Sequence, residues 1–163
     1  MGLIHTQEGI GERKSWPGEI PVESLYTAGI AGMRFFTALR DEGRILGSRC
    51  KRCSTLTLLP RAFCERCLYP TDAYEEVRGE GQIKTFTLVR RDLDGDPVDP
   101  PKVLALIVFE GIEGGIIHRV REIQPGDVRI GLRVEAVLLP KGKRKGSILD
   151  VSHFRPIGSG SGG

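Results

Sequence analysis

The sequence predicts a mainly β protein, and three observations support this fold class. All four cysteines fall in two closely spaced C-x2-C pairs, which predicts a small ribbon over residues 44–73. Residues 74–157 contain five short apolar segments separated by turns rich in glycine and proline, a pattern typical of a small barrel. Only residues 29–43 combine helical periodicity with a stop signal. At 163 residues, the chain is long enough for one such barrel carrying a smaller module.

Residues 1–28 predict an extended arm, because they are rich in Gly, Glu and Pro and show no regular apolar period. Within the arm, Trp16 and Tyr26 are expected to be anchors laid on another surface, of this chain or of a partner. The arm lacks the basic stretch and apolar core of a signal peptide. The longest strongly apolar run, Val103 to Phe109, is shorter than the ~20 residues that span a bilayer. We therefore expect a cytoplasmic protein with no membrane span.

Residues 29–43 predict the one helix, with Gly43 as its stop. At about 100° per residue, two faces are apolar: Phe35, Phe36 and Leu39 on one, and Ile30 and Met33 on another. A helix that is apolar on more than one side is expected to be buried on more than one side. The second cover is either the rest of this chain or a partner subunit.

The four cysteines predict a structural zinc site. The ligands lie in RCKRC and FCERC, as Cys50, Cys53, Cys64 and Cys67. Each pair can offer two thiolates from one tight turn, and the short hairpin between the pairs brings them together tetrahedrally. A thioredoxin-like redox pair is the alternative, but two pairs this close without a βαβ pattern disfavour it. Because such a site uses all four ligands, we expect one Zn²⁺ per chain that folds the ribbon and catalyses nothing.

Basic residues are concentrated on the ribbon. Residues 44–73 carry six Lys or Arg against two Asp or Glu, whereas residues 1–43 carry four against six and residues 74–163 fourteen against thirteen. A basic module favours an anionic partner such as a phosphate group, a nucleic acid or an acidic protein face. The alternative is an ordinary solvated face.

After the ribbon, the pattern changes to strands, which we expect at residues 77–91, 103–109, 116–120, 133–139 and 147–154. Gly79 and Gly81 predict a bulge or sharp coil in the first of them. DLDGDPVDPP predicts a loop, and KGKRKG a basic hairpin tip. Five short strands with a glycine-kinked first strand fit an OB-type barrel over residues 74–157.

Two features adjoin this barrel. Its second strand contains LALIVF, which is apolar on both faces, so the outer face needs a cover. The predicted helix is the expected cover. Residues 158–163, GSGSGG, have the composition of a flexible tail or linker and are left out of the fold.

No catalytic constellation emerges from the sequence. Its three histidines are scattered and have no neighbouring nucleophile motif: His5, His118 and His153. The two on predicted strands are expected to be ordinary barrel residues. GIEGG joins two strands and does not lead into a helix, so it is not a phosphate-binding loop. The acidic DLDGDPVD lacks the terminal glutamate of a calcium loop. We expect this chain to be non-catalytic on its own.

Four ordered segments resemble a known family: RCKRCSTLTLLPRAFCERC, VRGEGQIKTFTLV, IGLRVEAVLLP and FRPI. This is the acyl-CoA-associated zinc-ribbon/OB-fold family, once catalogued as domain of unknown function thirty-five, and the resemblance covers residues 33–157. It implies an accessory subunit or domain of a thiolase-type enzyme, as in acetoacetyl-CoA thiolase complexes and steroid side-chain aldolases. The chain departs from the family pattern after each cysteine pair, where Ser54 and Leu68 replace the usual glycine.

The long arm favours a particular branch of this family, the small subunit that partners a thiolase of anaerobic toluene degradation. The implied reaction is thiolysis of (S)-2-benzoylsuccinyl-CoA to benzoyl-CoA and succinyl-CoA. The resemblance also implies contact with coenzyme A, whose phosphates Arg and Lys can pair with. The candidates are Arg49, Lys51, Arg52, Arg61, Lys143, Arg144 and Lys145. Solubilising surface charge is the alternative for each of them.

A nucleic-acid-binding zinc-ribbon/OB protein is the alternative function. Such barrels normally carry aromatic stacking platforms among basic residues. The stretch from Glu110 to His153 contains no aromatic residue, and the barrel half is close to neutral. Nucleic acid is therefore the less expected partner.

Overall fold

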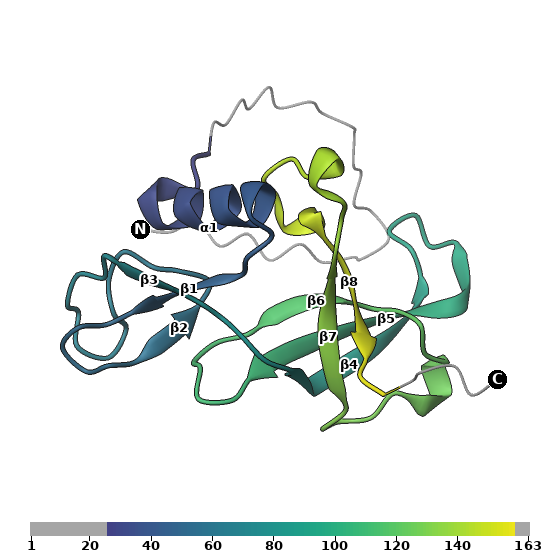
Figure 1. The fold of residues 1–163 in the computed structure, drawn as a ribbon. Coiled ribbons are helices and arrows are strands. Elements are labelled where there is room, and N and C mark those ends of the chain that lie inside the picture. The colour runs from purple at the N-terminus through teal and green to yellow at the C-terminus, as the bar shows by residue number, and fades with distance from the viewer. Residues whose placement is uncertain (1–25, 159–163) are drawn as a thin grey trace, which may run out of the picture.

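A computed structural model describes residues 26–158, which form a helix, a three-stranded sheet and a closed barrel (Figure 1). Trp16 and nearly all of the predicted arm lie outside the described residues, as does the GSGSGG tail apart from Gly158. The mainly β fold with one α-helix confirms the predicted fold class. None of the helices within residues 26–158 has the length and apolar character needed to cross a bilayer.

The helix α1, Gly29–Asp41, packs through a single stripe. Its buried residues recur at helical spacing: Ala31, Phe35, Ala38 and Leu39. Ile30 and Met33 are 81% and 57% exposed, so residues 26–158 do not supply the second cover that the sequence predicts. Gly43 follows the helix at φ +70°, and the amides of Glu42 and Arg44 both donate to the carbonyl of Ala38. This left-handed residue ends the helix as predicted.

The ribbon is a three-stranded antiparallel sheet in the order β2-β1-β3. Its strands are β1 Leu46–Arg49, β2 Leu56–Leu58 and β3 Ala73–Glu76. The ribbon is fixed to the barrel by β2, because the amide of Leu58 donates to the carbonyl of Glu113 at 2.8 Å and the amide of Glu113 donates to Leu56 at 2.9 Å. One hydrophobic cluster joins α1, the ribbon and the barrel.

The barrel closes in the order β4-β5-β6-β8-β7. Its strands are β4 Gly81–Arg91, β5 Pro97–Phe109, β6 Ile116–Val120, β7 Arg133–Leu138 and β8 Val151–Pro156. β6 and β8 run parallel, and β7 returns to β4 through the pair Gly81 and Val134. A Cβ on Gly81 would lie 2.5 Å from Ile107 Cγ2, so closure needs glycine here. This is the OB arrangement.

The starts of three strands differ from the sequence prediction by four residues or more. β4 begins at Gly81, because Val77 still bonds to the ribbon through Ile45 and Gly79 turns the chain at φ +98°. The ladder irregularities lie further along β4, between Ile83 and Thr85 and between Val89 and Arg91. The predicted bulge glycines therefore form the junction between ribbon and barrel.

The other two differences lie at the starts of β5 and β8. β5 includes residues 97–101, because the side chain of Asp92 accepts the amides of Asp94 and Asp96 and closes the loop early. β8 begins at Val151, because Ile148–Asp150 form a 3-10 turn, η4.

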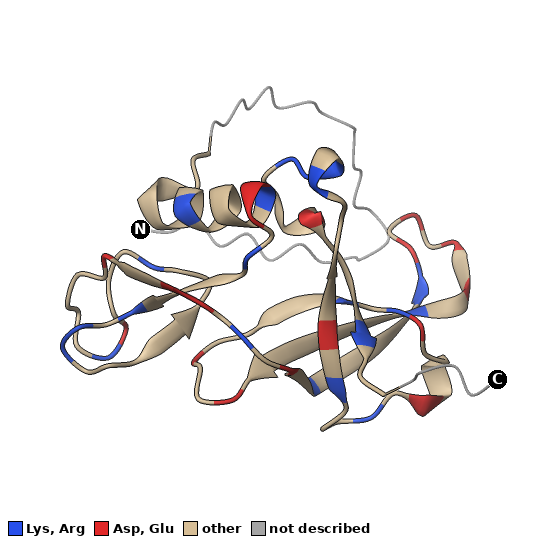
Figure 2. Cartoon of the chain, in the orientation of Figure 1, with Lys and Arg blue, Asp and Glu red and all other residues tan. Residues whose placement is uncertain are grey.

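The sequence predicts that the helix covers the outer face of β5, but α1 does not cover it. α1 packs mainly against β1 and η4. Leu104, Leu106 and Val108 are half-buried on that face. The backbone at Gly115 closes over part of it, since a Cβ there would lie about 3 Å from both Leu106 and Val108. Charged residues of both signs are spread over the ribbon and the barrel (Figure 2).

Candidate metal centre

Each cysteine pair sits on a tight turn with the same hydrogen bonds. In the first turn, the amide of Cys50 donates to Thr55 at 2.9 Å and the amide of Ser54 donates to Cys50 at 2.8 Å. In the second, the amide of Cys64 donates to Tyr69 at 2.9 Å and that of Leu68 donates to Cys64 at 2.9 Å. The two knuckles are therefore near copies, and each directs two sulfurs to the same point.

Ser54 and Leu68 adopt the left-handed backbone that the family pattern assigns to glycine. Their φ angles are 59° and 55°. Side chains other than glycine adopt this region at a cost of about 1–2 kcal/mol. The turns keep their geometry in spite of the substitutions, so the departure from glycine leaves the cysteines in place.

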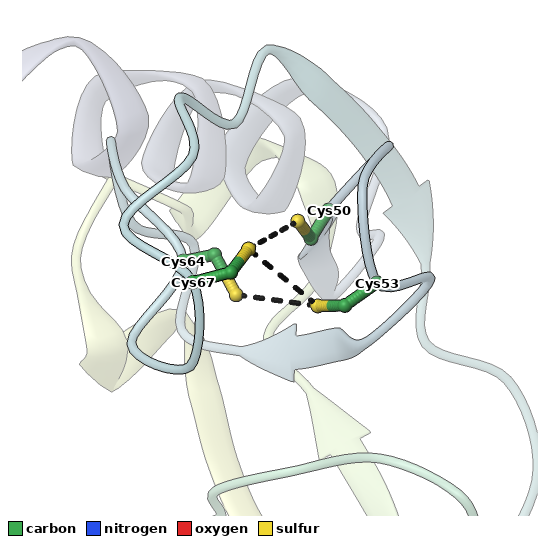
Figure 3. Close-up of side chains that lie close together, drawn as sticks. All are labelled: Cys50, Cys53, Cys64 and Cys67. Carbon is green, nitrogen blue, oxygen red and sulfur yellow. Dashed lines mark hydrogen bonds between the residues drawn. The ribbon is translucent and has the colours of Figure 1, made fainter.

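The four sulfurs form a compact cluster (Figure 3). The Sγ atoms of Cys50 and Cys67 are 3.5 Å apart, as are those of Cys53 and Cys64, and all four lie within 4.8 Å of one another. Zn–S bonds of about 2.3 Å in a tetrahedron place sulfurs about 3.8 Å apart. The residues present therefore fit a tetrahedral zinc ion. Cys50 and Cys64 are buried, and the other two lie nearer the surface.

The thiol pKa values show the repulsion that a cation would relieve. Hydrogen bonds from the side chain and backbone of Thr55 lower the pKa of Cys53 to about 6. A backbone hydrogen bond from Tyr69 lowers the pKa of Cys67, but burial and the three neighbouring thiols raise it overall, to about 11. Four adjacent thiols cannot all ionise without a positive charge among them, and a divalent ion permits it.

Such a centre supports the fold and leaves no room for a reaction. All four protein ligands are used, so no coordination position is open to a substrate or to an activated water. A metal bound here would link the first knuckle, which follows β1, to the second knuckle. This link would order the hairpin that β1 and β2 form.

The basic ribbon residues proposed to contact coenzyme A are mostly held by acidic neighbours. Arg49 Nε lies 2.6 Å from Glu75 and lowers the pKa of that carboxyl. Lys51 pairs with Asp72 at 2.7 Å, and Arg61 pairs with Glu65. Arg52 is exposed and makes no ion pair with any residue in 26–158. The ribbon therefore presents less free positive charge than its composition suggests.

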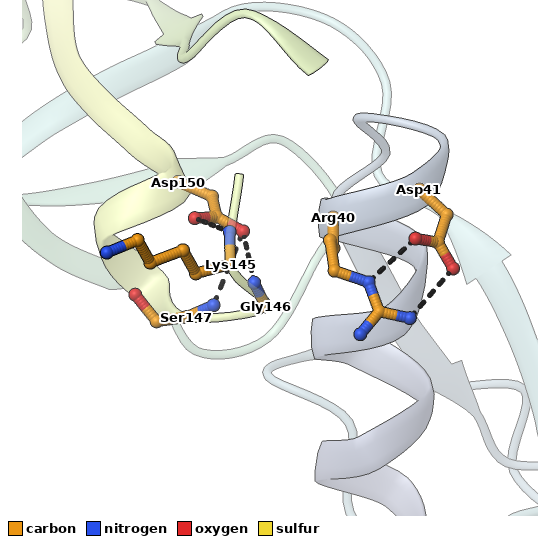
Figure 4. A network of polar contacts seen from close by, with 6 residues as sticks. All are labelled: Arg40, Asp41, Lys145, Gly146, Ser147 and Asp150. Carbon is orange, nitrogen blue, oxygen red and sulfur yellow. Dashed lines mark hydrogen bonds and ion pairs between the residues drawn. The ribbon is translucent and has the colours of Figure 1, made fainter. Parts of the chain in front are cut away.

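The predicted KGKRKG hairpin tip connects the antiparallel strands β7 and β8, and it contains the 3-10 turn η3, Lys141–Lys143, shortly before η4. Figure 4 shows the polar contacts of Asp150 in this loop. Asp150 accepts the amides of Lys145, Gly146 and Ser147 at 2.9, 2.7 and 3.3 Å. Arg144 turns inward, since its Nε donates to the carbonyl of Leu139 at 2.7 Å.

The guanidinium of Arg144 also covers the end of the helix. A Cβ on Gly43 would lie 2.6 Å from Arg144 Nη1. Arg144 is therefore a packing residue, whereas Lys143 and Lys145 stay exposed. The seven candidates do not form one cluster: the tip packs against the end of α1, while the others surround the knuckles.

Sequence reasoning missed the apolar surface of the second knuckle. Phe63, Leu68 and Tyr69 are 58%, 78% and 42% exposed, although all three flank Cys64 and Cys67. The signal was present as FCERCLY, in which apolar residues border a pair whose other neighbours are charged.

Two family models match the chain. The ChsH2 rubredoxin-like zinc ribbon domain matches residues 37–69, which include all four cysteines. The ChsH2 C-terminal OB-fold domain matches residues 74–139. Together they follow the division between ribbon and barrel.

Relatives and solved structures agree with these models. A DUF35 domain-containing scaffold protein of Methanocaldococcus jannaschii is 32% identical over 108 residues, covering 64% of this chain and 74% of that one. Another, from Pyrococcus furiosus, is 28% identical over 127 residues, covering 76% and 91%.

Among solved structures, a DUF35 protein of unknown function from Sulfolobus solfataricus aligns with a TM-score of 0.60 and 30% identity, covering 67% of this chain and 78% of that one. The Ltp2-ChsH2(DUF35) aldolase aligns with a TM-score of 0.58 and 23% identity, covering 78% and 95%, and shows the shared fold. With its four-cysteine ribbon followed by an OB barrel, the chain belongs to the DUF35 family of ChsH2-type zinc-ribbon and OB-fold proteins.

Proposed function

We propose that this chain is a non-catalytic accessory subunit, with one Zn²⁺ in its ribbon, that docks onto a thiolase-type catalytic subunit acting on an acyl-CoA. Two relatives are described as scaffold proteins, and a neighbour of the same fold is part of an aldolase that also contains Ltp2. Thiolase chemistry needs a free nucleophilic cysteine. All four cysteines of this sequence belong to the metal cluster, so the partner must supply the nucleophile.

The observation that carries the proposal is the ribbon patch, the set of exposed large apolar residues of the ribbon: Leu59, Phe63, Leu68 and Tyr69. Leu59 is 41% exposed, and the other three are between 42% and 78% exposed. Exposed apolar groups gathered on one small module mark a protein contact. Aromatic side chains among them are the residue type that anchors such contacts.

Backbone strain in the ribbon patch supports the same conclusion. Leu59 and Leu68 have φ angles of 63° and 55°, where leucine is disfavoured, and they are 41% and 78% exposed. Leu68 buries little apolar surface within the described chain that could offset this strain. Retaining strain of this kind is typical of a surface that binds.

The outer face of α1 offers a second apolar surface. Ile30 and Met33 lie on it, and Tyr26 just before the helix is 89% exposed. Permanent subunit contacts bury more than about 2,000 Å² in total. A contact that used both this face and the ribbon patch would account for the exposed apolar residues at this end of the chain.

For the substrate we propose (S)-2-benzoylsuccinyl-CoA, on the strength of the family resemblance. Arg52, Lys143 and Lys145 are the candidates left free to pair with coenzyme A phosphates in the complex. In that role, Lys145→Glu raises the KM for the acyl-CoA and leaves kcat unchanged, which is the signature of lost uniform binding.

The nucleic-acid alternative gains no support from the barrel. In the barrel strands that the structure describes, the Phe, Tyr and Trp residues are Phe86, Phe109 and Phe154, and each is buried or half-buried. An OB barrel that binds single strands stacks bases on exposed aromatic rings. We therefore favour the protein partner.

The test is co-purification of the tagged chain with the thiolase-type subunit from the same organism, followed by size-exclusion chromatography. Phe63→Asp and Leu68→Asp are expected to abolish the complex, while each variant keeps its zinc. Ile130→Asp is the matched control, because Ile130 is 67% exposed on the barrel. If both ribbon variants co-purify as well as the control, the ribbon patch is not the docking surface.

A further inference from the structure

A pocket at one end of the barrel, here called the barrel-end pocket, gathers unpaired cations. It has a volume of about 880 Å³ and lies where β5 begins and β6 ends. Four basic side chains line it: Lys102, Arg119, Arg121 and Arg129. Pockets that hold small ligands have volumes of about 300–1,000 Å³, so the space is of the right size.

These four side chains line one pocket, and no acidic side chain in the described part of the protein is bound to any of them. Most arginines of the ribbon and of the barrel rim are paired, as Arg133 is with Glu80 and Arg155 with Glu135. Within residues 26–158, none of the four pocket cations makes a side-chain hydrogen bond or an ion pair. All four are exposed.

The strand register forces the cations close together. Val103 of β5 pairs with Val120 of the antiparallel β6. Lys102 precedes Val103 and Arg121 follows Val120, so these two residues come next on the adjacent segments. Arg119 and Arg121 flank the buried Val120, so both project outward. Like charges placed side by side across strands are destabilising. An anion between them would remove that cost.

The acidic groups of the pocket do not neutralise the cations. Glu122 is held elsewhere, because its Oε1 lies 2.8 Å from His153 Nε2 and its Oε2 lies 3.9 Å from Arg155. Asp127 is the other acidic lining residue. Four cations against two carboxylates leave the pocket with a positive balance.

Arg119 and Arg121 also line a second groove, of about 410 Å³. That groove contains the apolar residues Leu104, Ile117 and Leu149, the last two being 71% and 63% exposed. A ligand with both a charged and an apolar part could use the two spaces together. No Phe, Tyr or Trp lines either one, and His118 in the second groove is buried, so neither provides an exposed stacking platform for the bases of a nucleic-acid strand.

We infer that the barrel-end pocket binds a small organic diphosphate, with its phosphates between Arg119 and Arg121 and its organic part in the adjoining groove. Arg guanidinium groups suit this ligand because they form paired, charge-assisted hydrogen bonds to phosphate oxygens. The site belongs to the isolated chain and does not depend on the proposed partner.

Calorimetric titration of the full chain with ADP and pyrophosphate at about 50 mM salt tests this inference. The pocket variant is Arg119→Gln with Arg121→Gln. The control, Lys84→Gln with Arg90→Gln, removes the same charge from exposed residues outside the pocket. We expect the pocket variant to bind both probes about tenfold or more weakly and the control to bind as the wild type does.

The absence of binding to either diphosphate would overturn the site, as would equal weakening in the two variants. An oligothymidylate that binds the wild type more tightly than ADP does would overturn the choice of a small ligand. If the pocket variant melts below the control, Lys102→Gln with Arg129→Gln serves as a second pair from the same pocket. If the chain binds neither diphosphate, it can still co-purify with the catalytic subunit. The two experiments therefore distinguish failure of this inference from failure of the proposed function.

Discussion

Leu68 illustrates how one side chain can be unfavourable for folding and useful for binding. Its φ of 55° strains the second knuckle, and 78% of the residue is exposed. Glycine would relieve the strain, yet leucine enlarges the ribbon patch. This exchange of stability for a binding surface is common at functional sites.

Leu68→Gly should therefore raise the free energy of unfolding of the zinc-loaded chain by about 0.5–1 kcal/mol. Leu68→Ala is the control, because it removes the same apolar surface and keeps the backbone strain. Denaturant unfolding measures both. A glycine variant no more stable than the alanine variant would show that the turn is unstrained. Both variants should weaken assembly with the catalytic subunit.

His118 is a second residue whose environment has a measurable consequence. It is buried beside Phe154, with ring centroids 6.0 Å apart, and its Nδ1 has no hydrogen-bond partner. Burial lowers the pKa of His118 below its ordinary value of 6.5. The folded state therefore resists protonation that the unfolded state accepts.

The free energy of unfolding should consequently be unaffected by His118 above pH 6.5 and should fall as the pH drops from there through the folded-state pKa. His118→Leu should have a flatter profile than the wild type over this range. Urea unfolding at a series of pH values measures the difference in unfolding free energy between the variant and the wild type. Because both proteins contain the same metal site, its pH dependence cancels in this difference. Parallel profiles would assign the pH dependence to another group.

At the scale of elements, the loop between β7 and β8 depends on one carboxylate. Asp150 is 2% exposed, and it accepts three consecutive backbone amides. These hydrogen bonds and the nearby Arg144 outweigh the effect of burial and hold the pKa of Asp150 below 3.8. The carboxylate thus fixes the basic tip against α1.

Asp150→Asn should lower the free energy of unfolding by about 1–3 kcal/mol, since one carboxylate oxygen becomes a donor facing an amide. Asp127→Asn, on the exposed 3-10 turn η2 (Pro125–Asp127), is the control and should be neutral. Because the pKa of Asp150 is lowered by folding, its stabilisation is present above pH 3.8 and is lost as the pH falls below that value. Equal stability of both variants would contradict this role.

The ribbon is the element most dependent on its metal. Cys50→Ser should release the zinc and unfold the ribbon, because metal binding supplies on the order of 10 kcal/mol of folding free energy in such modules. Ser54→Ala, in the same knuckle, should retain it. Elemental analysis should find one zinc per chain in the wild type and none in Cys50→Ser. Metal-free wild-type protein with the same melting temperature would refute a structural zinc.

Sequence patterns predicted some elements well for physical reasons. The strand Ile116–Val120 alternates buried and exposed residues, so its first and last residues can be predicted from this two-residue alternation alone. The cysteine spacing likewise identified the four side chains that the fold brings together. Contacts between distant segments were not predictable: Arg144 covering Gly43, and Glu113 bonding to β2, depend on how the modules pack. The positions of the pocket cations followed only from the strand register.

At the scale of the whole molecule, helix, ribbon and barrel share one core, yet apolar residues stay exposed on the helix and the ribbon. The core is continuous from Phe35 in α1 through Leu58 in the ribbon to Ile107 in the barrel. The ribbon patch and the outer face of α1 remain uncovered within residues 26–158. A rigid body that presents such surfaces is suited to hold a partner in a fixed position.

A thiolysis assay with (S)-2-benzoylsuccinyl-CoA tests the central claim most directly. It compares this chain alone, the thiolase-type subunit alone and the two combined, each with its zinc content measured. The proposal predicts that this chain alone is inactive, that its partner alone is inactive or unstable, and that the combination cleaves the substrate. Thiolysis by this chain alone would contradict a non-catalytic role, and a partner fully active without it would contradict the accessory role.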